Sequence, residues 1–332
     1  MPSSNPSDQR PTINDVRAAA DQIRGKAVLT PLLESPALNA RLGGRVLVKA
    51  EPLQRTGSFK FRGAYNKLSR LSRDELAAGV VTYSSGNHAQ GIAAVAQMLG
   101  APATIIMPTD APQIKVENTK SYGAEILTYE RDGAVDREAL ARKVVDERGA
   151  VLVSPFDDPY IIAGQGTIGL EIATQAKETG ANLDTVLVPC GGGGLVSGIA
   201  LALASDCPSA DVYAVEPAGF DSMTRSLAAG EPSGNVPGAR SICDALQPPR
   251  VGKYTFDVCQ KHLAGGIAIE DETVVRAMYV AFSELKLVVE PGGCIALAAA
   301  LEQAIQIEGR TVAVICSGGN VDQSVFVNAL TK

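Results

Sequence analysis

Short runs of aliphatic and β-branched residues recur along the chain, each followed by a segment with apolar residues at helical spacing. The runs lack the apolar–polar alternation that marks a strand with one face in water. Continuous apolar character is typical of parallel strands covered by helices on both faces. The pattern therefore predicts an α/β fold with parallel sheets. The predicted strands are residues 45–50, 80–85, 103–108, 124–129, 150–155, 185–189, 212–216 and 311–317.

Amphipathic helices are predicted between the strands. Each repeats apolar side chains every three or four positions and ends in a glycine, which favours the left-handed turn that stops a helix. They include residues 87–100, 137–149 and 167–180. The strands and helices of residues 81–156 form a compact unit. We therefore expect a small domain of these residues inserted in a larger domain of residues 1–80 and 157–332.

The composition narrows the class of protein. The chain has 332 residues, of which 45% are hydrophobic, enough to bury a core and to exclude general disorder. Its 30 basic and 36 acidic residues give a net charge of -6, whereas a nucleic-acid binder normally shows a basic face. No apolar run approaches the ~20 residues of a membrane span, and the polar start lacks the apolar segment of a signal peptide. We expect a cytoplasmic protein without nucleic-acid or membrane partners.

Cysteine and histidine usage excludes whole mechanisms. The six cysteines are widely spaced without a C-x-x-C pair, which argues against a disulfide framework and against a zinc site. The two histidines, His88 and His262, rule out any mechanism that needs several imidazoles. No G-x-S-x-G motif is present, as a hydrolase with a nucleophile elbow would require.

The loops after the predicted strands are the places to look for ligands, because ligands of open α/β sheets bind beyond the carboxyl ends of the strands. In the first loop, residues 54–63, Ser58 is the expected helix N-cap and Lys60 lies between Phe59 and Phe61. A lysine opposes the dipole at a helix start, and the phenyl groups would desolvate it. Both effects lower the pKa of the amine, as a nucleophile needs. The alternative is an ordinary solvated lysine.

The second loop, residues 84–91, joins a strand to a helix and begins with two serines. Backbone N–H groups and the hydroxyls converge there, which favours the binding of an anion. Ordinary capping of the helix by Ser85 or Asn87 is the alternative interpretation.

The third loop carries the strongest local signal. Four successive glycines run from a strand into a helix and leave no side chain between the backbone amides and a ligand, so a phosphate is the natural occupant. The P-loop pattern is absent, and Val196 and Ser197 stand where G-x-G-x-x-G needs its third glycine. Glu216, about 20 residues on, still resembles a ribose-binding acid. A purely structural glycine turn is the remaining alternative. The glycines are Gly191, Gly192, Gly193 and Gly194.

The fourth loop, residues 316–322, also follows a strand. Ser317 would point into the same crevice, and the glycines after it allow close approach; a turn capped by Asn320 or Asp322 is the alternative. Together the four loops supply a desolvated lysine, a phosphate cradle and short polar groups. That set suits an aldehyde cofactor that bears a phosphate and is held on Lys60.

Seven segments carry a resemblance to a known family. They are GSFKFRGA (57–64), SSGNHAQG (84–91), residues 155–171, PCGGGGL (189–195), VEP (215–217), VEPGG (289–293) and CSGGNVD (316–322). In this order they are similar to the threonine/serine dehydratase and serine racemase group of pyridoxal-phosphate (PLP) enzymes, of the tryptophan-synthase-β fold (fold type II). The resemblance spans nearly the whole chain. It implies two open parallel-sheet domains with flanking helices and PLP in the cleft.

The resemblance assigns roles around the cofactor. Lys60 would bind PLP covalently and remove the substrate's Cα proton. Ser317 would hydrogen-bond the pyridine nitrogen and Asn87 the ring hydroxyl, with Phe59 beside the ring and Glu290 near the cofactor. The phosphate would lie on the four glycines of the third loop.

The resemblance also assigns residues to the substrate. Ser85 would be a catalytic acid–base group on the opposite face of the ring, which racemases and dehydratases both carry. Arg137 would match a substrate-side arginine of the racemases. The residues expected to bind the substrate carboxylate are Ser84, Ser85, Gly86, Asn87 and His88.

Members of the family often bind a divalent cation, Mg²⁺ or Ca²⁺, through a glutamate, a carbonyl and an aspartate. The corresponding positions here are Glu216, Phe220 and Ser222. Serine is a weak replacement for the aspartate, although Asp221 is adjacent, and a site with more waters stays open. The alternative is that Glu216 simply ends a strand.

The resemblance implies an ammonia-lyase that dehydrates a β-hydroxy amino acid, with L-threonine and L-serine as expected substrates. A hydroxyl at Ser317 cannot keep the pyridine nitrogen protonated as a carboxylate would, so expulsion of the β-hydroxyl is favoured over a long-lived carbanion. The rivals are an amino-acid racemase, a dehydratase for phenylserine or 3-hydroxyaspartate, and a PLP- or nucleotide-binding regulator. The family also implies a homodimer.

Overall fold

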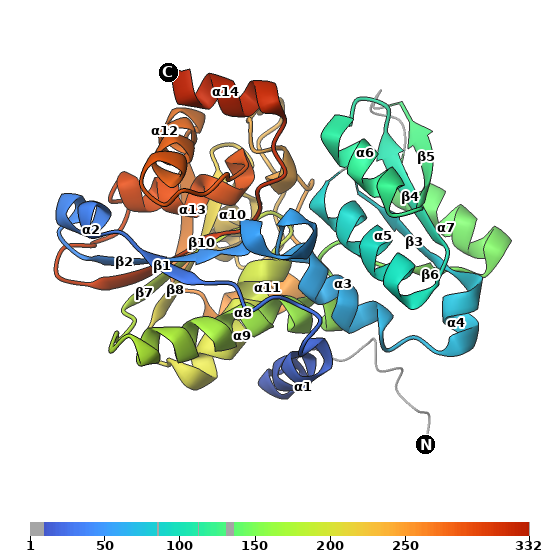
Figure 1. Cartoon of the computed structure of the whole chain (residues 1–332), viewed down its shortest axis with the longest axis horizontal. Helices are drawn as coiled ribbons and strands as arrows, with labels where there is room; N and C mark the ends of the chain where they lie inside the picture. Colours follow the sequence, from blue (N-terminus) through green and yellow to red (C-terminus); the bar gives the residue numbers. More distant parts are fainter. Residues whose placement is uncertain (1–9, 85, 112, 131–135, 332) are drawn as a thin grey trace.

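Two separate β-sheets organise the chain. The computed structural model describes residues 10–84, 86–111, 113–130 and 136–331. One sheet has six strands in the order β1-β2-β10-β7-β8-β9, and the other has four in the order β5-β4-β3-β6. Figure 1 shows the sheets in two lobes, with helix α3 running between them. The predicted α/β class with largely parallel sheets is confirmed.

Strands and helices alternate along most of the chain. The strands are β1 (Leu32–Glu34), β2 (Arg45–Ala50), β3 (Val80–Tyr83), β4 (Ala103–Pro108), β5 (Glu125–Tyr129), β6 (Val151–Leu152), β7 (Thr185–Pro189), β8 (Asp211–Pro217), β9 (Gly265–Ile269) and β10 (Thr311–Cys316). The helices are α1 (Ile13–Ile23), α2 (Pro36–Leu42), α3 (Lys60–Leu68), α4 (Arg73–Ala78), α5 (Asn87–Leu99), α6 (Gln113–Ser121), α7 (Arg137–Arg148), α8 (Pro159–Glu178), α9 (Gly194–Asp206), α10 (Ser222–Ala229), α11 (Lys253–His262), α12 (Asp271–Ser283), α13 (Pro291–Leu301) and α14 (Gln323–Thr331).

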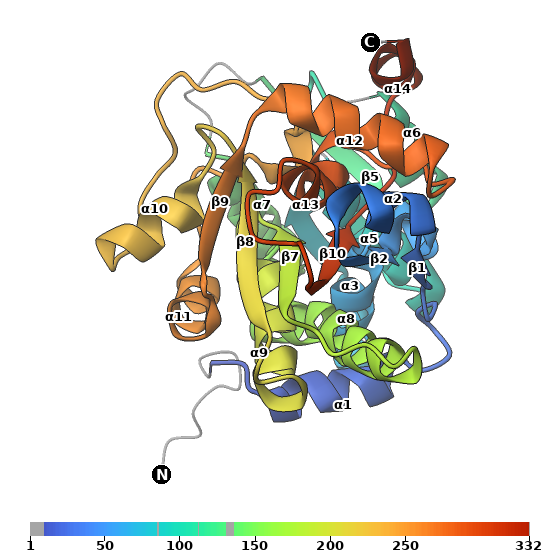
Figure 2. The same cartoon turned by 90° about the vertical axis from the view of Figure 1, so that its left-hand side faces the viewer.

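The larger sheet is buried on both faces, as its continuous apolar runs predict. Successive residues of β10 show why: Val312 and Val314 pack in the cluster with α12 and α13, whereas Ala313 and Ile315 pack in the cluster with α8 and α9. Figure 2 shows these two helix pairs on opposite sides of the strands. Because helices cover both faces, the ends of the strands are the places left for a ligand.

Helices α8 and α9 meet at glycines. A Cβ on Gly198 would lie 2.3 Å from the carbonyl oxygen of Ile162 and 2.6 Å from the amide nitrogen of Gly166. Glycine is required there, because any side chain would push the two helices apart. The contact lies one turn after the start of α9 and so sets where that helix begins.

Apart from Val80, the first residue of β3, the smaller sheet lies inside the segment predicted as an inserted domain. Its strands pair in parallel. Helix α5 packs on one face through Ile92 and Val95, and α7 packs on the other through Ala141 and Val144. The exact domain boundaries stay a prediction.

The hydrophobic pattern of the sequence does not predict two edge strands, β1 and β9. Strand β1 has only three residues and pairs antiparallel with β2, so the larger sheet is not purely parallel. Strand β9 begins with two glycines, which weaken the apolar signal. Both lie at sheet edges, where fewer side chains are buried and the pattern is weakest.

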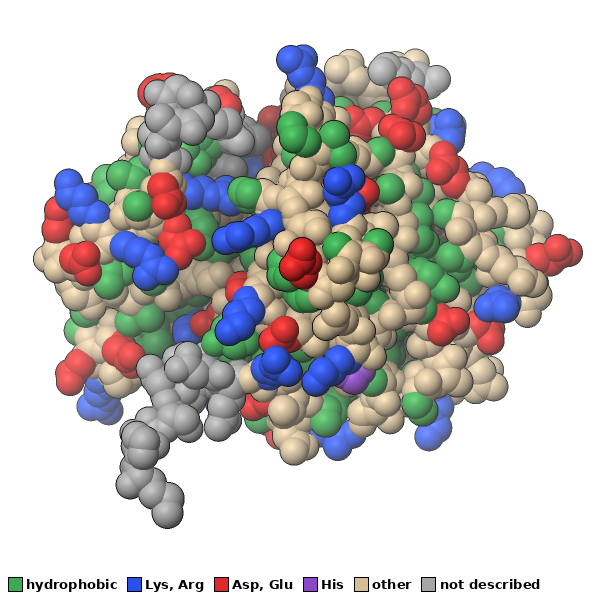
Figure 3. Space-filling view, turned by 180° about the vertical axis from the view of Figure 1, so that it is seen from behind, with side chains coloured by type: hydrophobic (Ala, Val, Ile, Leu, Met, Phe, Trp, Pro, Cys, Tyr) green, Lys and Arg blue, Asp and Glu red, His purple; other side chains and the backbone are tan. Residues whose placement is uncertain are grey.

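Charged side chains of both signs are interspersed on the face of the molecule in Figure 3. No basic stripe of the kind that tracks a nucleic-acid backbone lies on that face. None of the helices in the described part of the chain is long and apolar enough to cross a membrane.

Candidate active site

The loop before α3 pairs with the loop after β10. Ser58 forms an antiparallel bridge with Gly318, and the Phe59 amide donates to the Ser317 carbonyl oxygen at 3.1 Å. Ser58 is therefore not the helix N-cap that its sequence position suggests, because α3 begins at Lys60 with Phe59 as its N-cap. The first and fourth predicted loops lie side by side as a result.

Lys60 points into the molecule. Its Nζ donates to the Pro155 carbonyl oxygen at 2.7 Å and lies 5.1 Å from the centroid of the Phe59 ring. Burial lowers the pKa of the ammonium to about 8. Lys60 is half-buried, and its one neutral acceptor does not offset the loss of water, which argues against the alternative of an ordinary solvated lysine.

Asn320 ties the second loop to the other two. Its Nδ2 donates to the Thr56 carbonyl oxygen and to Asn87 Oδ1, each at 2.8 Å. The Asn87 amide in turn donates to Glu290 Oε1. Thr56 adopts a φ of 60°, a conformation that costs free energy for a β-branched residue. Loops from distant parts of the sequence therefore converge on Asn87.

Glu290 lies inside this junction. Its amide donates to the Gly318 carbonyl oxygen at 3.0 Å, and its Oε2 lies 3.2 Å from Lys115 Nζ. Burial raises the pKa of the Glu290 carboxyl, and the Lys115 charge opposes the rise. A Cβ on Gly318 would come 2.5 Å from Glu290 Oε1, so glycine lets this loop approach the carboxylate.

The glycine loop leaves a helix end uncapped. Gly193 is the N-cap of α9, has a φ of 94° and offers no side chain to the first-turn amides. A Cβ on Gly192 would lie 2.3 Å from the Phe156 ring, and one on Gly193 would lie 2.8 Å from Thr255 Cβ. Phe156 directly follows the residue whose carbonyl accepts the lysine's hydrogen bond. The uncapped amides fit a bound phosphate.

The second loop leads into another uncapped helix end. Helix α5 begins at Asn87, and its N-cap is Gly86, which has no side chain to cap it. Ser84 Oγ accepts a hydrogen bond from the Gly86 amide at 3.3 Å. Ser85 lies outside the described residues, so its acid–base role stays a prediction. The free amides at this helix end suit a carboxylate.

His88 is buried beside Lys60 and faces no solvent. Among the described residues neither ring nitrogen makes a hydrogen bond of normal geometry, although the backbone of Val153 lies against the ring. Burial holds the pKa of the imidazole well below its usual value, and the Lys60 charge lowers it further. The ring is therefore neutral, and a contribution to carboxylate binding would come from its backbone amide in the first turn of α5.

Arg137 lies at the same strand end as the second loop. It is the first residue of α7, and its guanidinium lies 5.6 Å from the centroid of the Tyr83 ring. Tyr83 ends β3 and directly precedes Ser84. Arg137 is thus placed near the loop for which it is the predicted substrate-side arginine.

The predicted cation ligands already have partners within the chain, and a cation at them stays a prediction. Both carboxylate oxygens of Glu216 accept hydrogen bonds from the start of α10: the Met223 and Thr224 amides at 2.8 Å and Thr224 Oγ1 at 2.7 Å. Ser222 is buried as the first residue of that helix, and Phe220 lies in the turn before it. The described residues contain no group of three or more His, Cys, Asp or Glu that could hold a metal. The Glu216 carboxylate therefore caps the first turn of α10.

Lys115 and Asp244 are site residues that the sequence does not predict. Lys115, on α6, is 2% exposed and pairs with Asp244 at 2.7 Å. Its segment has no apolar face, and the buried positions of α6 are Lys115 and Thr119. Polar residues four positions apart are just as common on exposed helix faces, so the sequence gives no signal for this buried face.

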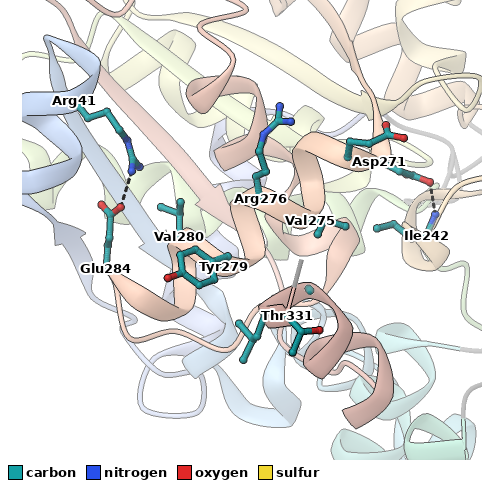
Figure 4. A pocket seen from close by; sticks show the side chains of 12 residues that line it. Arg41, Ile242, Asp271, Val275, Arg276, Tyr279, Val280, Glu284 and Thr331 are labelled. Carbon is teal, nitrogen blue, oxygen red and sulfur yellow. Dashed lines mark hydrogen bonds and ion pairs between the residues drawn. The ribbon is translucent and has the colours of Figure 1, made fainter.

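A surface hollow of about 840 Å³ lies beside α12 and α14. Figure 4 shows two of its polar pairs: Arg41 with Glu284 at 2.7 Å, and Asp271 with the Ile242 amide at 2.9 Å. None of the predicted site residues lines it. The junction of the loops, and not this hollow, is therefore the candidate active site.

Comparison with known proteins decides the family. The family model described as "Pyridoxal-phosphate dependent enzyme" matches residues 23–318. The chain belongs to this family. The resemblance inferred from the seven segments is thereby confirmed, and PLP is the cofactor of the family.

The relatives of this PLP enzyme have several activities. The chain is 40% identical over 322 residues to the L-threo-3-hydroxyaspartate ammonia-lyase of Saccharomyces cerevisiae, covering 97% of each chain. It is 38% identical over 322 residues to the serine racemase of Schizosaccharomyces pombe, covering 97% of this chain and 98% of the relative. The crystal structure of a threonine deaminase from T.th. matches with a TM-score of 0.88 and 41% identity, over 94% of this chain and 99% of that one.

Proposed function

We propose that the protein is a PLP-dependent ammonia-lyase that dehydrates a β-hydroxy amino acid and releases a 2-oxo acid and ammonia. L-Threonine and L-serine are the first proposed substrates. The observation that carries the proposal is Lys60, an amine with a lowered pKa at the junction where loops of both lobes meet. Ammonia-lyases and a threonine deaminase among the relatives support it.

Each residue of the junction has a proposed role toward PLP. Lys60 Nζ would hold the aldehyde carbon, the uncapped start of α9 the phosphate, Ser317 the ring nitrogen and Asn87 the ring hydroxyl. Phe59 would lie beside the ring. When bound, PLP supplies the electron sink that allows the substrate's Cα to lose a proton.

Residues of the chain would then accept the proton that leaves Cα and orient the substrate. Lys60, with a pKa of about 8, is partly a free amine at neutral pH and can accept it. The uncapped start of α5 would orient the substrate through its carboxylate. Ser317 would be a neutral partner of the pyridine nitrogen and would stabilise negative charge that accumulates on the ring less than a carboxylate would. Loss of the β-hydroxyl is favoured as a result.

Racemisation is the second candidate function. It is supported by similarity to serine racemases, such as that of Schizosaccharomyces pombe. Ser85 is the predicted acid–base group for the opposite face of the ring. Because dehydratases carry that serine as well, it does not discriminate between the two functions.

A substrate panel tests the proposal. Holoenzyme would be incubated with L-threonine, L-serine, L-threo-3-hydroxyaspartate or phenylserine, and 2-oxo acid, ammonia and the chirality of remaining amino acid measured. We expect equal amounts of 2-oxo acid and ammonia from at least one substrate, and none with Lys60→Ala. D-Serine in excess of pyruvate would favour the racemase. Equal turnover by Lys60→Ala and wild type would refute the lysine mechanism.

The resemblance also leads us to propose a homodimer and a cytoplasmic location. Light scattering of the purified holoenzyme tests the first: a mass near twice the 34.5 kDa of the chain is expected. A mass equal to one chain would contradict it.

A further inference from the structure

A buried ion cluster bridges the two lobes beside the second loop. Lys115 extends from α6 in the lobe of the smaller sheet. It reaches two carboxylates of the other lobe, Asp244 at 2.7 Å and Glu290 at 3.2 Å. An ammonium so removed from water needs carboxylate partners, because an unpaired buried charge is strongly unfavourable.

The two carboxylates are held differently. The Glu290 side chain is 2% exposed and also accepts a hydrogen bond from Asn87. The Asp244 side chain is 45% exposed, and in the part of the chain that is described Lys115 is the one donor to its carboxylate. Asp244 can therefore turn into water at little cost, whereas Glu290 cannot. Another carboxylate could therefore replace Asp244, but not Glu290, as the partner of Lys115.

The ammonium also faces the loop proposed to bind the substrate. Lys115 Nζ lies 3.9 Å from the position that a Cβ would take on Gly86, the N-cap of α5. An amino acid whose α-carboxylate lies on the start of α5 would therefore lie close to Lys115, and we take its Cβ substituent as the group that faces the ammonium. A second carboxylate on its Cβ, two bonds from Cα, is the group that matches a buried ammonium.

We propose that Lys115 binds the side-chain carboxylate of an acidic β-hydroxy amino acid in exchange for Asp244. The proposed lyase would then bind a 3-hydroxyaspartate-like substrate more tightly than serine and threonine, the substrates proposed first. The exchange leaves Lys115 with two carboxylates, so the charge of the cluster is unchanged. This inference rests on the proposed function and names the substrate class of the same site.

Binding of two nearly isosteric amino acids tests the exchange. L-Aspartate and L-asparagine lack a β-hydroxyl to lose and differ in the charge at the position that Lys115 would bind. Calorimetry with holoenzyme should give aspartate the tighter binding by about tenfold or more. Lys115→Met should abolish that ratio. Asp244→Asn should increase it severalfold, because the competing anion is gone.

The two variants are expected to move the ratio in opposite directions, which misfolding cannot do. Retained PLP absorbance and melting temperature would show that each variant folds. Equal changes for aspartate and asparagine in both variants would overturn the role of Lys115, as would asparagine binding tighter than aspartate in the wild type. Release of oxo acid from 3-hydroxyaspartate is measured separately. If the holoenzyme prefers aspartate through Lys115 but releases no oxo acid, the inference about Lys115 stands and the proposed lyase activity is refuted.

Discussion

At the scale of single residues, the candidate site removes charged groups from water and gives each a limited set of partners. Lys60 has a neutral carbonyl as its hydrogen-bond acceptor, and its neighbour His88 is neutral in the interior. The result is an amine that loses its proton more easily than a surface lysine. The sequence predicts a lowered pKa from the two phenyl groups adjacent in the chain. In the structure the Phe59 ring lies 5.1 Å from Lys60 Nζ, whereas Phe61 stacks on Tyr65.

The first prediction concerns the pH at which Lys60 reacts. Below its pKa of about 8 the group is an ammonium and cannot attack an aldehyde; above it the free amine predominates. The rate at which PLP-free protein captures PLP, followed by absorbance, should rise with pH to a midpoint near 8. Lys60→Arg should show no such capture. A midpoint near the ~10.4 of an ordinary lysine would contradict the desolvated amine.

Other residues could not be predicted, since their partners are far away in the sequence. Ser58 reads locally as a helix cap, yet its backbone pairs with Gly318 near the other end of the chain. Lys115 reads as a surface lysine, yet two acids from the other lobe surround it. Local sequence patterns predict the strands and loops. The contacts of Ser58 and Lys115 join segments far apart in the chain, so no local pattern predicts them.

At the scale of elements, close packing of α8 on α9 positions the start of α9, where the glycine loop ends. Gly198→Ala should destabilise the protein by about 1–3 kcal/mol, because its methyl group would lie within 2.3 Å of the Ile162 carbonyl oxygen. Denaturant unfolding measures the change. Gly234→Ala is the matched control, since the nearest atom to a Cβ there is 3.7 Å away. Equal stabilities of the two variants would show that the helices do not need the glycine.

The start of α10 supplies a second element-scale prediction. Because Glu216 already accepts three hydrogen bonds from α10, a chelator should shift the melting temperature of the holoenzyme by less than about 1 °C. Thr224→Val removes one of those bonds and should cost about 0.5–1.5 kcal/mol with or without Mg²⁺.

A rise in melting temperature with Mg²⁺ concentration would contradict the predicted insensitivity to chelator. In that case Asp221 would be the group to examine, because its buried Oδ1 has no hydrogen-bond partner among the described residues. The sequence predicts Glu216 as a cation ligand and does not decide between a cation site and a simple strand end. It could not show that the helix amides occupy both carboxylate oxygens.

At the scale of the whole molecule, the candidate site joins two lobes that have separate cores. Asn87 belongs to the lobe of the smaller sheet, and Asn320 and Glu290 belong to the other. A cofactor held at this junction stabilises both lobes at once, because it binds only when they are folded and together.

We therefore expect saturating PLP to raise the melting temperature of the PLP-free protein by about 5 °C or more in a single transition. Differential scanning calorimetry measures it. In Lys60→Ala the shift should be smaller, since the phosphate contacts stay but the covalent link is lost. Two separate transitions, only one of them sensitive to PLP, would show that the cofactor does not join the lobes.

Strand β10 lies between β2 and β7, although it is the last strand in the chain. A ribosome therefore makes both neighbours long before the strand that separates them, and each waits with an unpaired edge. A chain released early would expose two apolar edges prone to aggregation and would lack Ser317. The proposed PLP site is therefore complete only once the last strand of the chain has been made.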